Sequence, residues 1–363
     1  MYNTSTIKSQ KELTYSAIDL LKKLIETPSF SSNESKTADL LIYWCEIHQI
    51  ACKRNKHNVW AINKFFDDKK PTLLLNSHHD TVFPNKGYTK DPFKAIVEDG
   101  KLYGLGSNDA GGALVSLLAT FSYFYDREDL AYNLIFVGSA EEENSGPNGL
   151  NSLLPLLPKI DVAIVGEPTL MQLAIAEKGL IVFDAKVYGT ASHAAHLNDD
   201  NPIYSAIEVL EWFKTYQFIK KSDVLGDVKM TVTQINAGKQ HNAIPNALDL
   251  VVDVRVNDKY TNKEIVAILK EECPCSEIEP RSIHLNSSSI SKNHDLIKAG
   301  MALGRKTYGS PTLSDQSVLS CPSLKLGPGK SKRSHTADEF IYIDEIKEGI
   351  DIYIKILSSI LNS

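Results

Sequence analysis

Short, continuous runs of apolar residues alternate with helical patterns over the first half of the chain. Three of these runs end abruptly in polar or acidic residues: 72–77, 133–139 and 161–166. Runs without polar alternation are typical of strands buried on both faces, as in a parallel sheet. Apolar residues at helical spacing predict helices between and before them: 11–26, 36–50 and 112–125. Strands that alternate with helices predict an α/β fold with an open, mostly parallel sheet.

Residues 179–285 follow a different pattern. Strands and helices are expected there in the order β-α-β-β-α-β, over 180–189, 202–216, 230–237, 247–256, 262–271 and 277–285. In the strand over 247–256, alternate apolar residues share one face: Leu248, Leu250, Val252, Val254 and Val256. This order is typical of the ferredoxin-like α+β arrangement. The α/β pattern then returns and ends in an amphipathic helix over 344–361, so we predict a domain over 179–285 inserted into one built from 1–178 and 286–363.

Composition narrows the possible partners and location. The 363 residues include 39 basic and 45 acidic side chains, for a net charge of −6, and 42% are hydrophobic. Such a mix is typical of a globular protein with a core, and the lack of a basic excess argues against a nucleic-acid partner. No stretch approaches the ~20 apolar residues of a membrane span, and no apolar signal segment is seen near Met1. A cytoplasmic protein is expected, and its five sparse cysteines are expected to be reduced thiols.

Histidines and carboxylates follow the three apolar runs directly. His78-His79-Asp80 follows the first, Glu141-Glu142-Glu143 the second, and Glu167 the third. Because ligands bind at the carboxyl ends of parallel strands, these residues are expected to converge at one edge of the sheet. Asp109 lies in a glycine-rich loop over 104–112, and His335 lies in a late loop expected near the same edge.

A mixture of imidazoles and carboxylates is suited to zinc or a similar divalent metal. The number of these side chains exceeds what one tetrahedral ion needs, so two ions that share a bridging carboxylate are expected. If the Glu142–Glu143 segment is extended, adjacent side chains diverge, and one can bind metal while the other faces water. Each cluster alone could be a solvated acidic run or a simple turn, but three clusters after three buried runs favour a metal site.

The ordered motifs resemble those of the dinuclear zinc aminoacylase and exopeptidase superfamily. This group includes acetylornithine deacetylase, succinyl-diaminopimelate desuccinylase, N-acetylcitrulline deacetylase and glutamate carboxypeptidase. The matching motifs, within a resemblance over about 25–350, are His78-x-Asp80-x-Val82, Gly106-Ser-Asn-Asp109-x-Gly-Gly, Glu141-Glu142-Glu143, Gly166-Glu167-Pro168-Thr169 and Ser334-His335-Thr336. The resemblance implies that the inserted domain is a lid or dimerisation domain.

The resemblance implies a metal-binding role for five of these residues. His78 and Glu167 would hold one zinc ion, Glu143 and His335 would hold the other, and Asp109 would bridge both. Cobalt or manganese stay open as alternatives, because affinity order and cellular supply are not written in the sequence.

Three further residues match catalytic positions of the family. Asp80 would orient His78, and Glu142 would be the general base that takes a proton from the attacking water and delivers it to the leaving amine. His193 matches a lid histidine that stabilises the oxyanion in the active site of a partner subunit, so a homodimer is expected. The plain alternative for His193 is a surface histidine.

Four positions match substrate-binding motifs. Asn242 and Arg255 belong to lid motifs, and Arg255 points away from the leucine and valine face, free to clamp a carboxylate unless it is simply an exposed edge residue. Gly327 and Gly329 would offer backbone N–H groups close to a bound carboxylate. Phe83, which separates Val82 from Pro84, departs from the usual pattern and leaves the subfamily open.

The expected activity is that of a zinc amidohydrolase that removes a short acyl group from the nitrogen of an amino acid. The preferred reaction is deacetylation of N-acetylornithine in arginine biosynthesis. Alternatives are N-acetylcitrulline deacetylation, desuccinylation of succinyl-diaminopimelate or a related amino acid, and a metallo-carboxypeptidase or dipeptidase. An inactive binding or regulatory relative would lack a ligand or the base, whereas all are present. Serine hydrolase chemistry ranks low because no G-x-S-x-G motif occurs.

Overall fold

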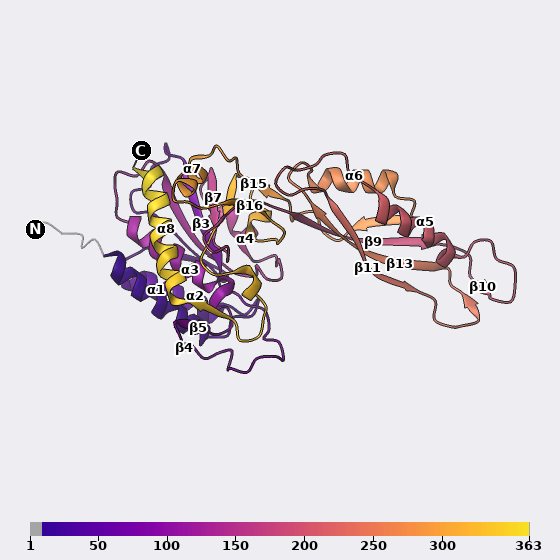
Figure 1. Ribbon diagram of the computed structural model, residues 1–363, viewed down its shortest axis with the longest axis horizontal. Helices are drawn as coiled ribbons and strands as arrows, with labels where there is room; N and C mark the ends of the chain where they lie inside the picture. Colours follow the sequence, from indigo (N-terminus) through magenta and orange to yellow (C-terminus); the bar gives the residue numbers. More distant parts are fainter. Residues whose placement is uncertain (1–8, 363) are drawn as a thin grey trace, which may run out of the picture. The chain divides into compact units, whose positions relative to one another are not determined.

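The computed structural model describes residues 9–362, which divide into two compact units. The larger unit contains the chain up to Ile175 together with Ser289–Tyr308 and the residues from Ser314 on. The smaller unit contains Ala176–Ser288 and Gly309–Leu313 (Figure 1). The sequence pattern placed 309–313 in the larger domain, which the structure contradicts. Gly309 packs so closely against the smaller unit that a Cβ there would lie 2.5 Å from the Val224 carbonyl oxygen.

The larger unit is built on a nine-stranded sheet in the order β1-β2-β6-β3-β7-β17-β8-β15, with β16 paired to β8. Its central strands β6, β3, β7 and β17 are parallel, while β1 and β2 are antiparallel additions. The strands span Cys52–Asn55 (β1), Asn58–Ile62 (β2), Thr72–His78 (β3), Asn133–Ser139 (β6), Val162–Val165 (β7), Leu173–Glu177 (β8), Ser288–Ser289 (β15), Thr307–Ser310 (β16) and Ser323–Lys325 (β17). A mixed α/β fold with a largely parallel central sheet is therefore confirmed.

Helices cover this sheet. The helices of the larger unit are α1 (Gln10–Ile25), α2 (Ser35–Ile47), α3 (Gly112–Phe124), α4 (Leu150–Leu153), α7 (Asp295–Ala302) and α8 (Ile343–Leu361). The apolar helix α3 contacts β3 and β6 on one side and α1 and α8 on the other, so it is buried at the centre of the unit. A small sheet, β4 (Ile96–Glu98), β5 (Lys101–Tyr103) and β18 (Phe340–Tyr342), lies apart. Among residues 9–362, no helix is both long and apolar enough to span a membrane.

The smaller unit contains an antiparallel sheet in the order β11-β13-β9-β14 with α5 and α6. Its elements are β9 (Gly179–Tyr188), β10 (Ser192–His193), α5 (Pro202–Thr215), β11 (Lys229–Ala237), β12 (Ala243–Ile244), β13 (Ala247–Val256), α6 (Asn262–Glu272) and β14 (Glu277–Pro280). The even-numbered residues of β13 from Leu248 on are buried, as the pattern predicted. The last strand is shorter than expected and ends at Pro280, whose nitrogen cannot donate to the sheet. That this unit serves as a lid or dimerisation domain stays a prediction.

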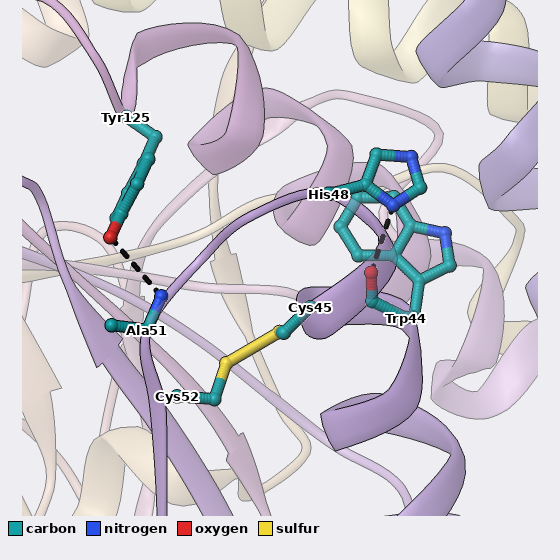
Figure 2. The surroundings of a disulfide bond; sticks show 6 residues. All are labelled: Trp44, Cys45, His48, Ala51, Cys52 and Tyr125. Carbon is teal, nitrogen blue, oxygen red and sulfur yellow. Dashed lines mark hydrogen bonds between the residues drawn. A yellow bond between two sulfur atoms is a disulfide. The ribbon is translucent and has the colours of Figure 1, made fainter.

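A disulfide joins Cys45 in α2 to Cys52 at the start of β1 (Figure 2). The expectation that all five cysteines are reduced is therefore wrong for this pair. After α2 the chain turns back within a few residues, which brings the two Cα atoms to 6.4 Å, within the range for a disulfide. Trp44 stacks on His48 beside the bridge, and Tyr125 accepts a hydrogen bond from Ala51 N. Cys273, Cys275 and Cys321 are free thiols.

Candidate metal centre

The carboxyl ends of β3, β6 and β7 meet at one edge of the central sheet. His78 is the last residue of β3, and it pairs in register with Ser139 at the end of β6. Asn76 of β3 pairs with Val165 at the end of β7. The residues that follow β6 and β7, including Glu143 and Glu167, therefore reach the same edge as His78, where the sequence pattern expected them.

Two groups of possible metal ligands share one aspartate. His78, Asp109 and Glu167 form the first group, and Asp109, Glu143 and His335 form the second, with ligand atoms in each group within 4.8 Å of one another. His78 Nε2 lies 3.5 Å from Asp109 Oδ1, whereas His335 Nε2 lies 3.6 Å from Asp109 Oδ2. Each carboxylate oxygen of Asp109 therefore faces a different histidine, as required of a residue that bridges two ions.

The orientation of His78 comes from Asp80. The Nδ1 atom of His78 lies 3.0 Å from the Asp80 carbonyl oxygen and 3.4 Å from Asp80 Oδ1. The opposite ring nitrogen, Nε2, is therefore directed at Asp109 and Glu167. The Asp80 carboxylate also accepts hydrogen bonds from Glu142 N and Glu143 N, each at 3.1 Å. Asp80 thus links the two sides of the centre.

The loop that carries Asp109 is held by Glu339, a residue that the sequence motifs did not single out. The buried Glu339 carboxylate accepts hydrogen bonds from the backbone N–H groups of Gly106, Asn108 and Asp109. Burial and the nearby Asp109 carboxylate raise the pKa of Glu339 to about 8. The peptide bond between Asp109 and Ala110 is cis. The only sequence signal for Glu339 is its position four residues after His335.

The segment 141–145 is a turn, so the expectation of an extended Glu142–Glu143 segment is wrong. Glu141 adopts a left-handed backbone with φ 54°, and its N–H donates to Glu34 Oε1 at 3.0 Å. The same Glu34 oxygen accepts from Ser32 N at 2.7 Å, and Glu34 Oε2 accepts from His57 Nδ1 at 2.7 Å. The Glu34 side chain is fully buried. No pattern in the sequence around it indicated that it accepts hydrogen bonds from this turn.

Negative charge is concentrated at the centre. Burial raises the pKa of Glu142 well above its usual value, and burial together with Asp109 raises the pKa of Glu167 to about 8. A hydrogen bond to Glu143 raises the pKa of His335 to about 9. Because like charges this close repel one another, a set of buried oxygen and nitrogen donors of this kind is suited to two divalent cations.

The two glycines of the late loop lie close to neighbouring groups, and the role of the Gly329 N–H stays a prediction. The Gly327 N–H donates to Thr169 Oγ1 at 3.1 Å, so it is not available to a bound carboxylate as expected. A Cβ at Gly327 would lie 2.5 Å from the Glu167 carbonyl oxygen, so this glycine allows the loop to approach Glu167. Gly329 has φ 85° and lies against the side chain of Asn108, which is next to Asp109.

The structure brings together some of the expected residues of the smaller unit. His193 in β10 pairs with Ala243 in β12, and Ala194 N donates to Asn242 O, so His193 and Asn242 are neighbours. Arg255 lies near the other end of β13, and its guanidinium donates to Asp253 at 2.9 and 3.1 Å. Arg255 is therefore not the free clamp that the strand pattern indicated. The functional roles of His193 and Asn242 stay predictions.

An α/β unit whose acidic and histidine side chains form two groups around a shared aspartate is suited to hold two metal ions. Comparison with protein-family profiles matches residues 74–359 to the profile described as peptidase family M20/M25/M40. The chain belongs to this family. Its expected kinship with the dinuclear zinc aminoacylases and exopeptidases is confirmed, and so is its assignment as an enzyme.

Curated relatives agree with this assignment, and solved structures share the fold. The chain is 28% identical to acetylornithine deacetylase from Shigella sonnei, with 94% of this chain and 96% of the relative covered. It is 26% identical to succinyl-diaminopimelate desuccinylase from Rickettsia bellii, with 84% and 85% covered. A tripeptidase structure from Staphylococcus aureus shares the fold with a TM-score of 0.75, 20% identity and 96% and 98% coverage. A dinuclear metal binding peptidase from Bacillus subtilis has a TM-score of 0.74, 16% identity and 97% and 99% coverage.

Proposed function

We propose that this chain is a two-metal amidohydrolase that removes the acetyl group of N-acetylornithine, a step of arginine biosynthesis. The observation that carries the proposal is the position of Asp109, whose two carboxylate oxygens face the two ligand groups. Glu142 lies beside them, with its Oε2 at 4.0 Å from His78 Nε2. The similarity to acetylornithine deacetylase over most of the chain supports the choice of substrate. Desuccinylation of a succinyl-amino acid is the second candidate, because the desuccinylase from Rickettsia bellii is similar to nearly the same degree.

Five side chains would hold the metal ions. His78 and Glu167 would bind one ion, Glu143 and His335 the other, and Asp109 both. The donor types fit zinc, with cobalt and manganese as alternatives. When bound, two such ions polarise the amide carbonyl and lower the pKa of water.

Glu142 would move the proton during hydrolysis. It takes a proton from the attacking water and delivers it to the nitrogen of the leaving amino acid. The position of Glu142 supports this role, because its Oε2 lies 4.0 Å from His78 Nε2, beside the proposed metal ligands. Asp80 keeps His78 in position through the contacts at Nδ1.

The proposal includes a homodimer in which His193 serves the centre of a partner subunit. Two features of the smaller unit support an interface between copies. The edge strand β11 pairs with β13 alone among the described strands, and the neighbouring helix α5 exposes Ile203, Tyr204 and Ile207. Sedimentation of Tyr204→Glu together with Ile207→Glu should give a monomer with impaired turnover. An active wild-type monomer would contradict the use of His193 across subunits.

Amine release from a panel of substrates tests the proposed reaction. Purified protein loaded with zinc would be given N-acetylornithine, N-acetylcitrulline, succinyl-diaminopimelate, N-acetyl-alanine and a dipeptide, and kcat/KM would be compared. We expect the highest kcat/KM for N-acetylornithine. A preference for the succinyl substrate would favour the second candidate, and turnover confined to the dipeptide would rule out the deacylase reaction.

A further inference from the structure

Three phenylalanines form a surface beside the metal centre. Phe83 lies three residues after Asp80 and exposes 74% of its surface. Its ring stacks on Phe30 with centroids 4.1 Å apart, and Phe93 meets the Phe30 ring edge-on at 6.0 Å. Backbone pairing of Phe30 with Thr81 holds the two segments together. The ring of Phe83 is therefore supported from behind while its outer face stays open.

A pocket of about 210 Å³ opens beside this ring. It is lined by Val82, Phe83, Pro84, Asn85, Tyr88, Leu105 and His335. Because His335 also belongs to the second ligand group, the pocket shares one wall residue with the metal centre and lies beside it. A cavity of ~150 Å³ is enough to hold benzene, so this pocket can accept a phenyl group or a short branched chain.

The lining suits an uncharged group. Among the described residues, no carboxylate, ammonium or guanidinium group lines the pocket. The amide of Asn85 is already engaged, because its Nδ2 donates to the His335 carbonyl oxygen and its Oδ1 accepts from Gly87 N. Burial and the Glu339 carboxylate raise the pKa of Tyr88, so its hydroxyl is neutral at physiological pH. Apart from His335, which belongs to the second ligand group, the lining therefore offers a charged group no ionic partner.

We propose that this pocket is a substrate subsite for an uncharged, apolar group next to the scissile amide, with Phe83 as its specificity-determining residue. The inference rests on the proposed amide hydrolysis and deepens it. The group belongs either to the acyl chain or to the amino-acid side chain; for N-acetylornithine it would be the methyl of the acetyl group, with the charged ornithine side chain outside this pocket. Each methylene group that enters the pocket should raise kcat/KM about fourfold.

Two substrate series distinguish the sources of the apolar group. In the first, the acyl group of one amino acid is lengthened from acetyl to butyryl to hexanoyl. In the second, the acetyl group is kept and the side chain grows from alanine to norvaline to norleucine. The full-length, zinc-loaded wild type is compared with Phe83→Ala, Phe83→Leu and Tyr15→Ala. Tyr15 is a matched control because it is an aromatic residue of α1 that is 56% exposed and does not line the pocket.

We expect wild-type kcat/KM to rise with chain length in one series. Phe83→Ala should abolish most of that rise, while Phe83→Leu and Tyr15→Ala keep it. Three outcomes would overturn the subsite. They are an unchanged rise of kcat/KM with chain length in Phe83→Ala, an equal fall of kcat/KM for every substrate in that variant, and no rise of kcat/KM in either wild-type series. Absence of amine release from every substrate by the loaded wild type would instead overturn the proposed function, and the subsite with it.

Discussion

Glu142 and Glu143 are adjacent in the chain but have different neighbours in the structure. Glu143 Oε2 lies 3.0 Å from His335 Nε2, whereas Glu142 Oε2 lies 4.0 Å from His78 Nε2. Both backbone N–H groups are held by Asp80. A turn held at its backbone thus places two identical side chains beside different histidines, which is consistent with the proposed roles of Glu143 as a ligand and Glu142 as a base.

Replacement of the base should separate chemistry from metal binding. For Glu142→Gln we expect kcat to fall by about 10²–10⁴-fold, the usual contribution of a general base, while two metal ions per chain remain bound. Amine release and metal analysis by mass spectrometry would be measured on the same preparation. Glu46→Gln, which alters an exposed glutamate of α2, is the matched control. Retained turnover in Glu142→Gln would contradict the role of the base.

Glu34 should position the base without contacting substrate. Glu34→Ala removes the acceptor for Glu141 N, and we expect kcat to fall by about 10–100-fold as the turn shifts. Glu34→Gln keeps one oxygen for Glu141 N and Ser32 N, so most activity should return. Steady-state kinetics with thermal unfolding as the control would test this. Equal losses of kcat in both variants would mean that Glu34 does not act through these hydrogen bonds.

Local contacts at the ends of helices and strands stabilise individual elements. Helix α6 begins with a capping box in which Thr261 and Glu264 bond reciprocally to backbone N–H groups. Helix α2 is joined to β1 by the disulfide between Cys45 and Cys52. Both features act over a few residues, so their effects can be tested without altering the metal centre.

The capping box of α6 should add a pH dependence to stability. Lys220 and the Thr261 backbone and hydroxyl groups lower the pKa of Glu264 from 4.5 to about 2. Because the folded-state pKa is the lower one, the stabilisation is present above about pH 4.5 and is lost as the pH falls towards 2. Glu264→Gln should therefore lower the stability of the smaller unit most above pH 5. Chemical unfolding from pH 3 to pH 7 would measure this, and a difference from wild type that does not change with pH would contradict it.

The disulfide should constrain the unfolded chain. Because the two cysteines are separated by seven positions along the sequence, loop-closure entropy predicts that Cys45→Ser with Cys52→Ser lowers the free energy of unfolding by about 2–3 kcal/mol. Urea unfolding without reductant would measure the loss. Thiol titration of the denatured, unreduced wild type should find the three free cysteines, and five reactive thiols would show that the bridge is absent.

At the scale of the whole molecule, all five proposed metal ligands belong to the larger unit. The smaller unit has a hydrophobic core of its own. Binding of metal should therefore stabilise one unit and leave the other nearly unchanged. The proposed interface between copies belongs to the smaller unit, so assembly and metal binding can be varied separately.

Removal of metal should shift only one thermal transition. At a free metal concentration about 1,000 times Kd, each bound ion adds about 4 kcal/mol to the free energy of unfolding. A chelator removes that contribution from the larger unit. Scanning calorimetry of the full chain, with and without chelator, should show a lower transition temperature for one of two transitions. An equal shift of both, or no shift, would contradict metal binding confined to the larger unit.

Several features could be predicted from local patterns. Uninterrupted apolar runs indicated β3, β6 and β7, and alternate apolar residues indicated the buried face of β13, because these patterns depend only on the period of the strand. The polar residues after β3, β6 and β7 indicated one edge of the sheet, because parallel strands end on the same side. Fine geometry was predicted less well: the turn after β6 depends on Glu34, which is more than one hundred residues earlier in the chain.

The sequence by itself therefore determined three features through interactions among near neighbours. These are the order of the elements, the histidine and carboxylates at the strand ends, and the division of apolar residues between faces. Only the tertiary structure decided that Asp109 faces both His78 and His335, that Glu339 and Glu34 hold the two loops, and that Arg255 pairs with Asp253. It also decided the bridge between Cys45 and Cys52. The physical reason is that hydrogen bonds and ligand groups depend on distances set by packing of the whole unit, which a local period does not contain.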